Sequence, residues 1–201
     1  MYNYKKHLSL TIAFAMLLLS TFNAVASTHL QIGLGAHHLT GSASPLAYQA
    51  AFSLGYHQKS GCQSEIGLLA QQDNLSMQIV AYAAYPLLQL NNLTLSARLQ
   101  GSIGAGFSND IWYYRSLAVG AQANLLSNNH LVTAWVVQGK KEASAWRFNQ
   151  LKVPFRVYGI SIAPMSQGLG ITVTTSDSPA PPELGTISRI WAVTAEYRRT
   201  L

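Results

Sequence analysis

The sequence predicts a single all-β domain built as an up-and-down antiparallel barrel. Apolar and polar residues alternate with a period of two along most of the chain after residue 26, as they do in strands with one apolar face. No apolar run after that point approaches the ~20 residues that a membrane-spanning helix needs. Only 10% of the 201 residues are charged, against about a quarter in ordinary soluble domains. This composition disfavours a disordered chain and a typical cytosolic enzyme.

The first 26 residues have the organisation of a cleaved secretory signal peptide. Lys5 and Lys6 precede an apolar stretch at 8–19, and Ala24-Val25-Ala26 offers a small-x-small cleavage site. The apolar stretch is too short to span a bilayer as a helix. We therefore expect an exported protein whose single barrel domain covers residues 27–201.

Ten segments qualify as strands. The clearest is 46–56, where the even positions are apolar or aromatic and the odd positions are small or polar. In chain order the predicted strands cover residues 30–38, 46–56, 64–71, 75–85, 93–105, 111–125, 130–138, 153–162, 169–175 and 187–197. Most have about the length of a tilted membrane-spanning strand. The count becomes eight if 30–38 or 169–175 is not a strand.

Turn-forming residues and prolines separate these segments. Asn91-Asn92 and Ser127-Asn128-Asn129 are examples, and every proline except Pro154 lies in a predicted gap. If the chain enters from the periplasmic side, the connections on that side are short. The connections at 139–150 and 175–186 then lie outside the cell and are the longest in the chain, an asymmetry typical of membrane barrels.

Alternation alone does not show which face points outward. A soluble barrel buries its apolar face, whereas a transmembrane barrel exposes it to lipid. Here the polar faces carry Gln, Ser, Thr, Gly and Ala rather than Lys and Glu. This chemistry suits a narrow interior filled by side chains, so the sequence favours the transmembrane barrel.

Two groups of side chains support that choice. Four strand charges alternate with apolar neighbours and could form a charge network in the lumen, although four separate solvent-exposed charges would give the same pattern: Glu65, Arg98, Arg156 and Glu196. Arg115 and Arg189 depart from this parity. Aromatic residues also gather near strand ends, where interfacial girdles are expected: Tyr48, Tyr56, Tyr85, Trp112, Tyr113 and Tyr197.

The signal peptide, the alternating strands and their scarcity of lysine resemble small bacterial outer-membrane proteins of the opacity-protein and porin-like class. The resemblance rests on pattern over the mature chain rather than on a motif. It implies location in the outer membrane of a Gram-negative envelope, contact with outer-membrane lipid and lipopolysaccharide, and insertion by the barrel-assembly machinery.

Residues with catalytic or ligating chemistry do not converge on a site. His37 and His38 point to opposite faces of a strand, which argues against a shared metal. His57, Ser60 and Cys62 lie in one turn, but nothing in the sequence supplies an orienting acid. The sequence therefore predicts no catalytic, cofactor-binding or metal site, and no basic stripe for nucleic acid.

The expected role is structural, surface-interactive or that of a narrow pore. Two alternatives remain: a soluble periplasmic barrel that binds an apolar ligand, and an outer-membrane enzyme that modifies lipid A. The sequence does not specify conduction, a ligand, the oligomeric state or the role of Cys62.

Overall fold

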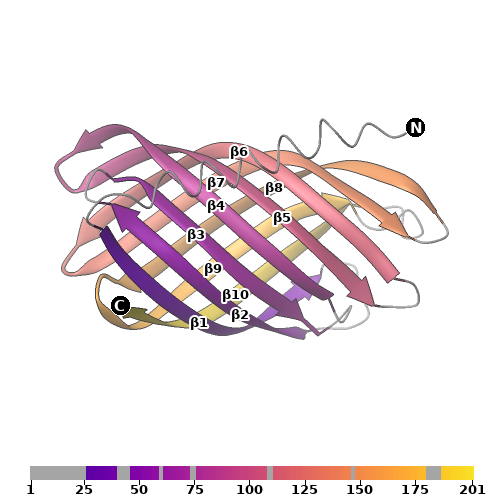
Figure 1. Ribbon diagram of the computed structural model, residues 1–201, viewed down its shortest axis with the longest axis horizontal. Coiled ribbons are helices and arrows are strands. Elements are labelled where there is room, and N and C mark those ends of the chain that lie inside the picture. The colour runs from indigo at the N-terminus through magenta and orange to yellow at the C-terminus, as the bar shows by residue number, and fades with distance from the viewer. Residues whose placement is uncertain are drawn as a thin grey trace.

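The computed structural model describes residues 26–39, 46–58, 61–72, 76–107, 111–145, 148–179 and 187–201. These residues form ten strands joined in one closed antiparallel barrel (Figure 1). The strands are β1 (Ala26–Leu39), β2 (Ala47–Gln58), β3 (Gln63–Gln71), β4 (Ser76–Leu90), β5 (Leu93–Phe107), β6 (Ile111–Ser127), β7 (His130–Ala145), β8 (Phe148–Pro164), β9 (Gln167–Pro179) and β10 (Ile187–Thr200). The prediction of a ten-strand up-and-down barrel is confirmed.

Each strand pairs with its sequence neighbours, and β1 closes the barrel against β10. The closing register pairs Ile32 with Tyr197 and Leu34 with Ala195. Closure leaves no strand edge exposed, and an exposed edge is what makes open sheets prone to further pairing. No helix in the described part of the chain is long and apolar enough to cross a membrane.

The turns at the end of the barrel where β1 begins are tight, as the sequence predicts. Asn128 and Asn129 both have positive φ, at 46° and 63°, which is the backbone of a two-residue hairpin turn. Asn91, at 44°, occupies the equivalent turn between β4 and β5. Asparagine tolerates this left-handed conformation better than other non-glycine residues do.

The opposite end differs from prediction, because the strands are longer than their apolar pattern. The segment 139–150, predicted as a long loop, is mostly strand: β7 continues to Ala145 and β8 begins at Phe148. Segment 175–186 is shortened likewise, since β9 reaches Pro179, and residues 180–186 lie outside the described part.

Proline also occurs within strands: Pro154 lies within β8, and Pro86 lies within β4 where the register shifts before Leu88. A bulge accommodates a residue that cannot donate to the ladder.

The barrel is inverted relative to a soluble protein. Large apolar side chains along the strands are exposed on the outside, for example Leu34, Phe52, Ile103, Val119 and Ile160. Many buried side chains are polar or charged: His29, His37, Gln49, Ser53, Gln63, Ser64, Ser76, Ser96, Arg98, Gln122, Asn124, Thr194, Glu196 and Arg198. This distribution excludes the soluble barrel with an apolar interior, because only a lipid solvent favours it.

Candidate functional site: the barrel lumen

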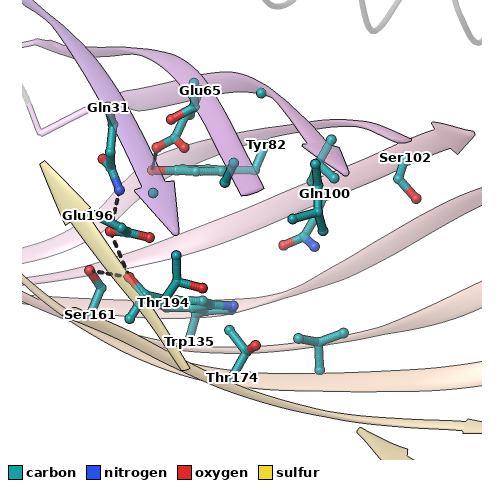
Figure 2. Close-up of a pocket in the computed structure, with 18 of the residues that line it drawn as sticks. Gln31, Glu65, Tyr82, Gln100, Ser102, Trp135, Ser161, Thr174, Thr194 and Glu196 are labelled. Atoms are coloured by element: carbon teal, nitrogen blue, oxygen red, sulfur yellow. Dashed lines mark hydrogen bonds between the residues drawn. The ribbon is translucent and has the colours of Figure 1, made fainter. Parts of the chain in front are cut away.

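The interior holds a cavity of about 410 Å³ to which all ten strands contribute lining residues. Its volume lies within the range of small-molecule sites. Gln, Ser and Thr side chains make up much of the lining, and Figure 2 shows Gln31, Gln100, Ser102, Thr174 and Thr194 among them. Apolar side chains such as Leu131, Phe155 and Ile190 complete the lining, so the cavity has a mixed surface rich in polar groups, enclosed by an apolar outer wall.

A stacked arginine lies inside the lumen. The Arg98 guanidinium carbon lies 3.8 Å from the ring centroid of Tyr82 and 4.8 Å from that of Trp135, within cation–π range. Its Nη1 donates to Gln122 Oε1 at 2.7 Å, and its Nη2 donates to Gln100 Oε1 at 3.0 Å. With 7% of its surface exposed, Arg98 is held on several sides.

Tyr82 connects this arginine to a carboxylate. The Tyr82 hydroxyl donates to Glu65 Oε2 at 3.2 Å, while the face of its ring contacts Arg98. Glu65 and Arg98 thus interact through an intervening tyrosine instead of forming a direct ion pair within 4.0 Å.

A chain of amides crosses the lumen beside Arg98. Gln122 donates to Gln63 Oε1 at 2.6 Å and to Asn124 Oδ1 at 3.0 Å, and Asn124 also accepts from the Thr133 hydroxyl at 3.0 Å. Gln122 is 2% exposed. Since buried polar groups are costly without partners, this network fixes the relative positions of β3, β6 and β7.

The second luminal carboxylate has neutral donors. Glu196 accepts from the Gln31 amide and, at 3.0 Å, from the Thr172 hydroxyl, which lies 2.9 Å from the hydroxyl of Ser161 (Figure 2). Arg198, two residues along β10, makes a 3.0 Å hydrogen bond with His29 Nδ1. Of the four residues predicted as a charge network, the structure therefore places Glu65, Arg98 and Glu196 in the lumen but in separate hydrogen-bonded groups.

Arg156, the fourth predicted member, points outward, and its placement in the lumen was wrong. Phe155 and Val157 line the cavity, whereas Arg156 shares the outward parity of Tyr158 and Ile160. Apolar side chains stand on both faces of this part of β8. The prediction assigned the apolar Phe155 and Val157 to the outward face and therefore placed Arg156 on the inward face. The lipid-facing residues nearer the other end of β8 define the true outward face.

Arg115 and Arg189, which departed from the predicted parity, do point outward. Arg115 forms an ion pair with Glu142, and Arg189 Nε contacts Asp177 Oδ1 at 2.8 Å. Both pairs lie toward the end opposite the tight turns, Arg115 one outward position past Leu117 and Arg189 one outward position past Trp191. A position near the lipid headgroups accounts for them without a bulge.

The predicted interfacial aromatics have mixed positions. Tyr48, Tyr85, Tyr113 and Tyr197 are exposed on the outer face, near strand ends. Tyr56 has the outward parity but is only 6% exposed, and the side chain of Trp112 lies outside the described part. Sequence reasoning missed Tyr158 and Trp191, which are exposed outward and adjoin the outward arginines of β8 and β10.

The remaining candidates do not form a reactive centre. His37 is buried on the inner face while His38 occupies the opposite face. Within the described residues no group of three metal-ligating side chains is present. His57 lines the cavity, Cys62 is a free thiol in the adjoining turn, and Ser60 lies outside the described residues.

A closed antiparallel barrel with an apolar outer wall and a polar interior defines the class of outer-membrane β-barrel proteins. No family model matches the sequence, and no curated protein matches it. Solved structures resemble its fold. Neisserial surface protein A is 10% identical, with 88% of this chain and 99% of that chain covered and a TM-score of 0.40.

Two further neighbours are similar at the same level. The β domain of the Bordetella autotransporter BrkA is 9% identical over 88% of this chain and 99% of that chain, with a TM-score of 0.48. Outer membrane phospholipase A from Escherichia coli is 9% identical over 88% of this chain and 92% of that chain, with a TM-score of 0.37. The class assignment rests on this barrel's own surface and interior.

Proposed function

We propose that the protein forms a narrow hydrophilic pore through the outer membrane. The observation that carries this proposal is the luminal cavity of about 410 Å³, to which every strand contributes. At the end with the tight turns its lining includes His29, Gln63 and Ala163. Toward the other end it includes Lys141 and Ser176. The cavity thus follows the barrel axis over much of the wall.

The lining suits water, ions and small polar solutes. Polar side chains can replace hydration along the path, and the clustered side chains of Arg98, Tyr82 and Trp135 project into it. A ten-strand barrel lies between small barrels filled by side chains and the wide porins. We therefore propose size-limited permeation of small hydrophilic solutes.

Single-channel recording from the refolded protein in a planar bilayer tests this function. We expect discrete conductance steps for the natural sequence and larger steps for Trp135→Ala, which removes an indole from the lining of the cavity. Val119→Ala, on the lipid-facing wall, is the matched control and should leave the steps unchanged. A barrel that is folded, as judged by an electrophoretic shift on heating, but silent in both forms would refute the pore and favour a structural role.

We also propose that residues 1–26 are removed on export and that the barrel-assembly machinery inserts the remaining chain. β1 begins at Ala26 and is paired with β2 from that residue onward, so cleavage before Ser27 leaves almost the whole strand. The mass of protein purified from outer membranes measures this directly. A mass that retains the first 26 residues would contradict it.

A further inference from the structure

The strands divide sharply by the charge of their outer face. The only charged residues in β1 to β5 are Glu65 and Arg98, and both line the cavity. Toward the end opposite the tight turns, the outward positions of β6 to β10 instead carry five cations: Arg115, Lys140, Lys152, Arg156 and Arg189. The basic patch, as we call these five residues, covers one side of the barrel only.

The patch lies directly beyond lipid-facing residues. Arg115 follows Leu117 by one outward position, Arg156 follows Tyr158, and Arg189 follows Trp191. Successive outward positions are about 7 Å apart along a strand. These three arginines therefore stand at the depth of the headgroups with an aromatic or aliphatic side chain just below, and Lys140 is the direct partner of the lipid-facing Leu117 across the β6–β7 pair.

Two acids within the patch neutralise only part of it. Glu142 binds Arg115 and lies 3.3 Å from Lys152 Nζ, and Asp177 binds Arg189. The Arg115 hydrogen bond holds the pKa of Glu142 below its usual value, so this acid is ionised near neutral pH. The patch keeps a net charge of about +3 from five cations and two acids.

Lys140 and Arg156 form the part with the least compensation. Arg156 donates to neutral partners, the Tyr158 hydroxyl at 3.3 Å and Gln138 Oε1 at 3.4 Å, although Asp177 is its neighbour across the strand pair. Lys140 is exposed and has no acid partner among the described residues. The register makes Lys140 and Arg156 diagonal neighbours on β7 and β8, about 7–8 Å apart. Two long cationic side chains at that spacing can reach one phosphate.

We infer that the basic patch binds the phosphate groups of an anionic lipid in the outer leaflet, with Lys140 and Arg156 as the principal ligands. Lipid is favoured over a soluble polyanion because the cations project from the barrel wall at headgroup depth, beside residues that contact acyl chains. The inference does not depend on conduction, since the patch and the lumen are on opposite faces of the wall.

Native mass spectrometry of the whole barrel in neutral detergent tests this inference. The probes are bisphosphorylated lipid A, the same lipid after dephosphorylation, inorganic phosphate and a heparin fragment. We expect retention of the phosphorylated lipid and roughly tenfold weaker binding by the double variant Lys140→Gln/Arg156→Gln. Arg199→Gln removes an exposed outward cation at the opposite end of β10 and should have no effect.

Three outcomes would overturn the inference. They are equal binding of the dephosphorylated lipid, unchanged binding by the double variant, and displacement of the lipid by inorganic phosphate or heparin at matched phosphate or sulfate concentration. The last would assign the patch to free anions or sulfated polymers. The electrophoretic shift on heating shows whether each variant is folded. Both substitutions lie on the exposed face, so we expect the shift to be retained.

Discussion

Replacing Gly159 with alanine should displace the indole of Trp135. The two residues are direct cross-strand partners on β7 and β8, and the ring lies against the glycine. A Cβ at position 159 would be 2.1 Å from Cζ2 and 2.3 Å from Cε2 of the indole. Contacts under 3.0 Å require movement, so the ring must rotate into the lumen or the strands must separate.

The size of the effect follows from the contacts. Overpacking of this kind costs about 1–3 kcal/mol, and moving the ring also weakens its contact with Arg98, worth roughly 0.5–2 kcal/mol. Trp135→Ala alone should cost up to about 3 kcal/mol, near the low end for an aromatic truncation because the ring borders a cavity. In the double variant the clash is absent, so the sum of the single costs should exceed the double cost by at least ~1 kcal/mol.

The cycle requires the free energy of unfolding of the natural sequence, of the two single variants and of the double variant. Urea titration of the barrel in vesicles measures each of them. Ile160→Val, on the outward face beside Gly159, is the control partner and should combine additively with Trp135→Ala. Additivity of Gly159→Ala and Trp135→Ala to within ~0.5 kcal/mol would refute the reasoning. Such additivity would mean that the indole of Trp135 does not require a glycine at position 159.

Three further predictions use the same titration. Gln122→Leu leaves the buried guanidinium of Arg98 short of an acceptor, so we expect a loss of about 2–4 kcal/mol; an unchanged midpoint would contradict the amide network. Ile160→Arg places a charge on the lipid-facing wall and should cost about 2–4 kcal/mol, whereas a cost near zero would mean that this face is not in lipid. Glu142 has a lowered pKa because it accepts from Arg115, so its contribution is present above its unfolded value near 4.5 and is lost as pH falls through the lower folded value. Since the arginine is 43% exposed, we expect less than ~1 kcal/mol, and Glu142→Gln should remove that dependence on pH.

Strand number and order could be predicted because lipid imposes one clear pattern on the chain. Apolar alternation located all ten strands, and asparagines located two of the tight turns. The parts of β7 and β8 farthest from the tight turns were missed because the outward side chains there are polar, as at Lys140 and Lys152. Above the bilayer the hydrogen-bond ladder continues without an apolar face, so periodicity carries no signal there.

The lumen was less predictable, because its polar residues do not differ in kind from those of a loop. Glu65, Arg98 and Glu196 were identified by parity, yet their partners are mostly neutral side chains on adjoining strands, which a search for charges does not reveal. Gln122 and Tyr82 were missed, although both have the inward parity of their strands. Counting every inward Gln and Tyr as a candidate, rather than charges alone, would have found them.

Glycine placement explains how the lumen can hold large rings and still contain a cavity. Trp135 lies against Gly159, the His29 ring lies against Gly55, and the Tyr114 ring lies against Gly104, each glycine being the direct partner of its ring across a strand pair. A ring over glycine can lie flat along the wall, where a neighbouring Cβ would force it to stand upright into the lumen. Substitution of these glycines should therefore reduce the cross-section as well as the stability. If conductance stays constant while stability falls, the rings do not define the path, and the narrowest point lies elsewhere in the barrel.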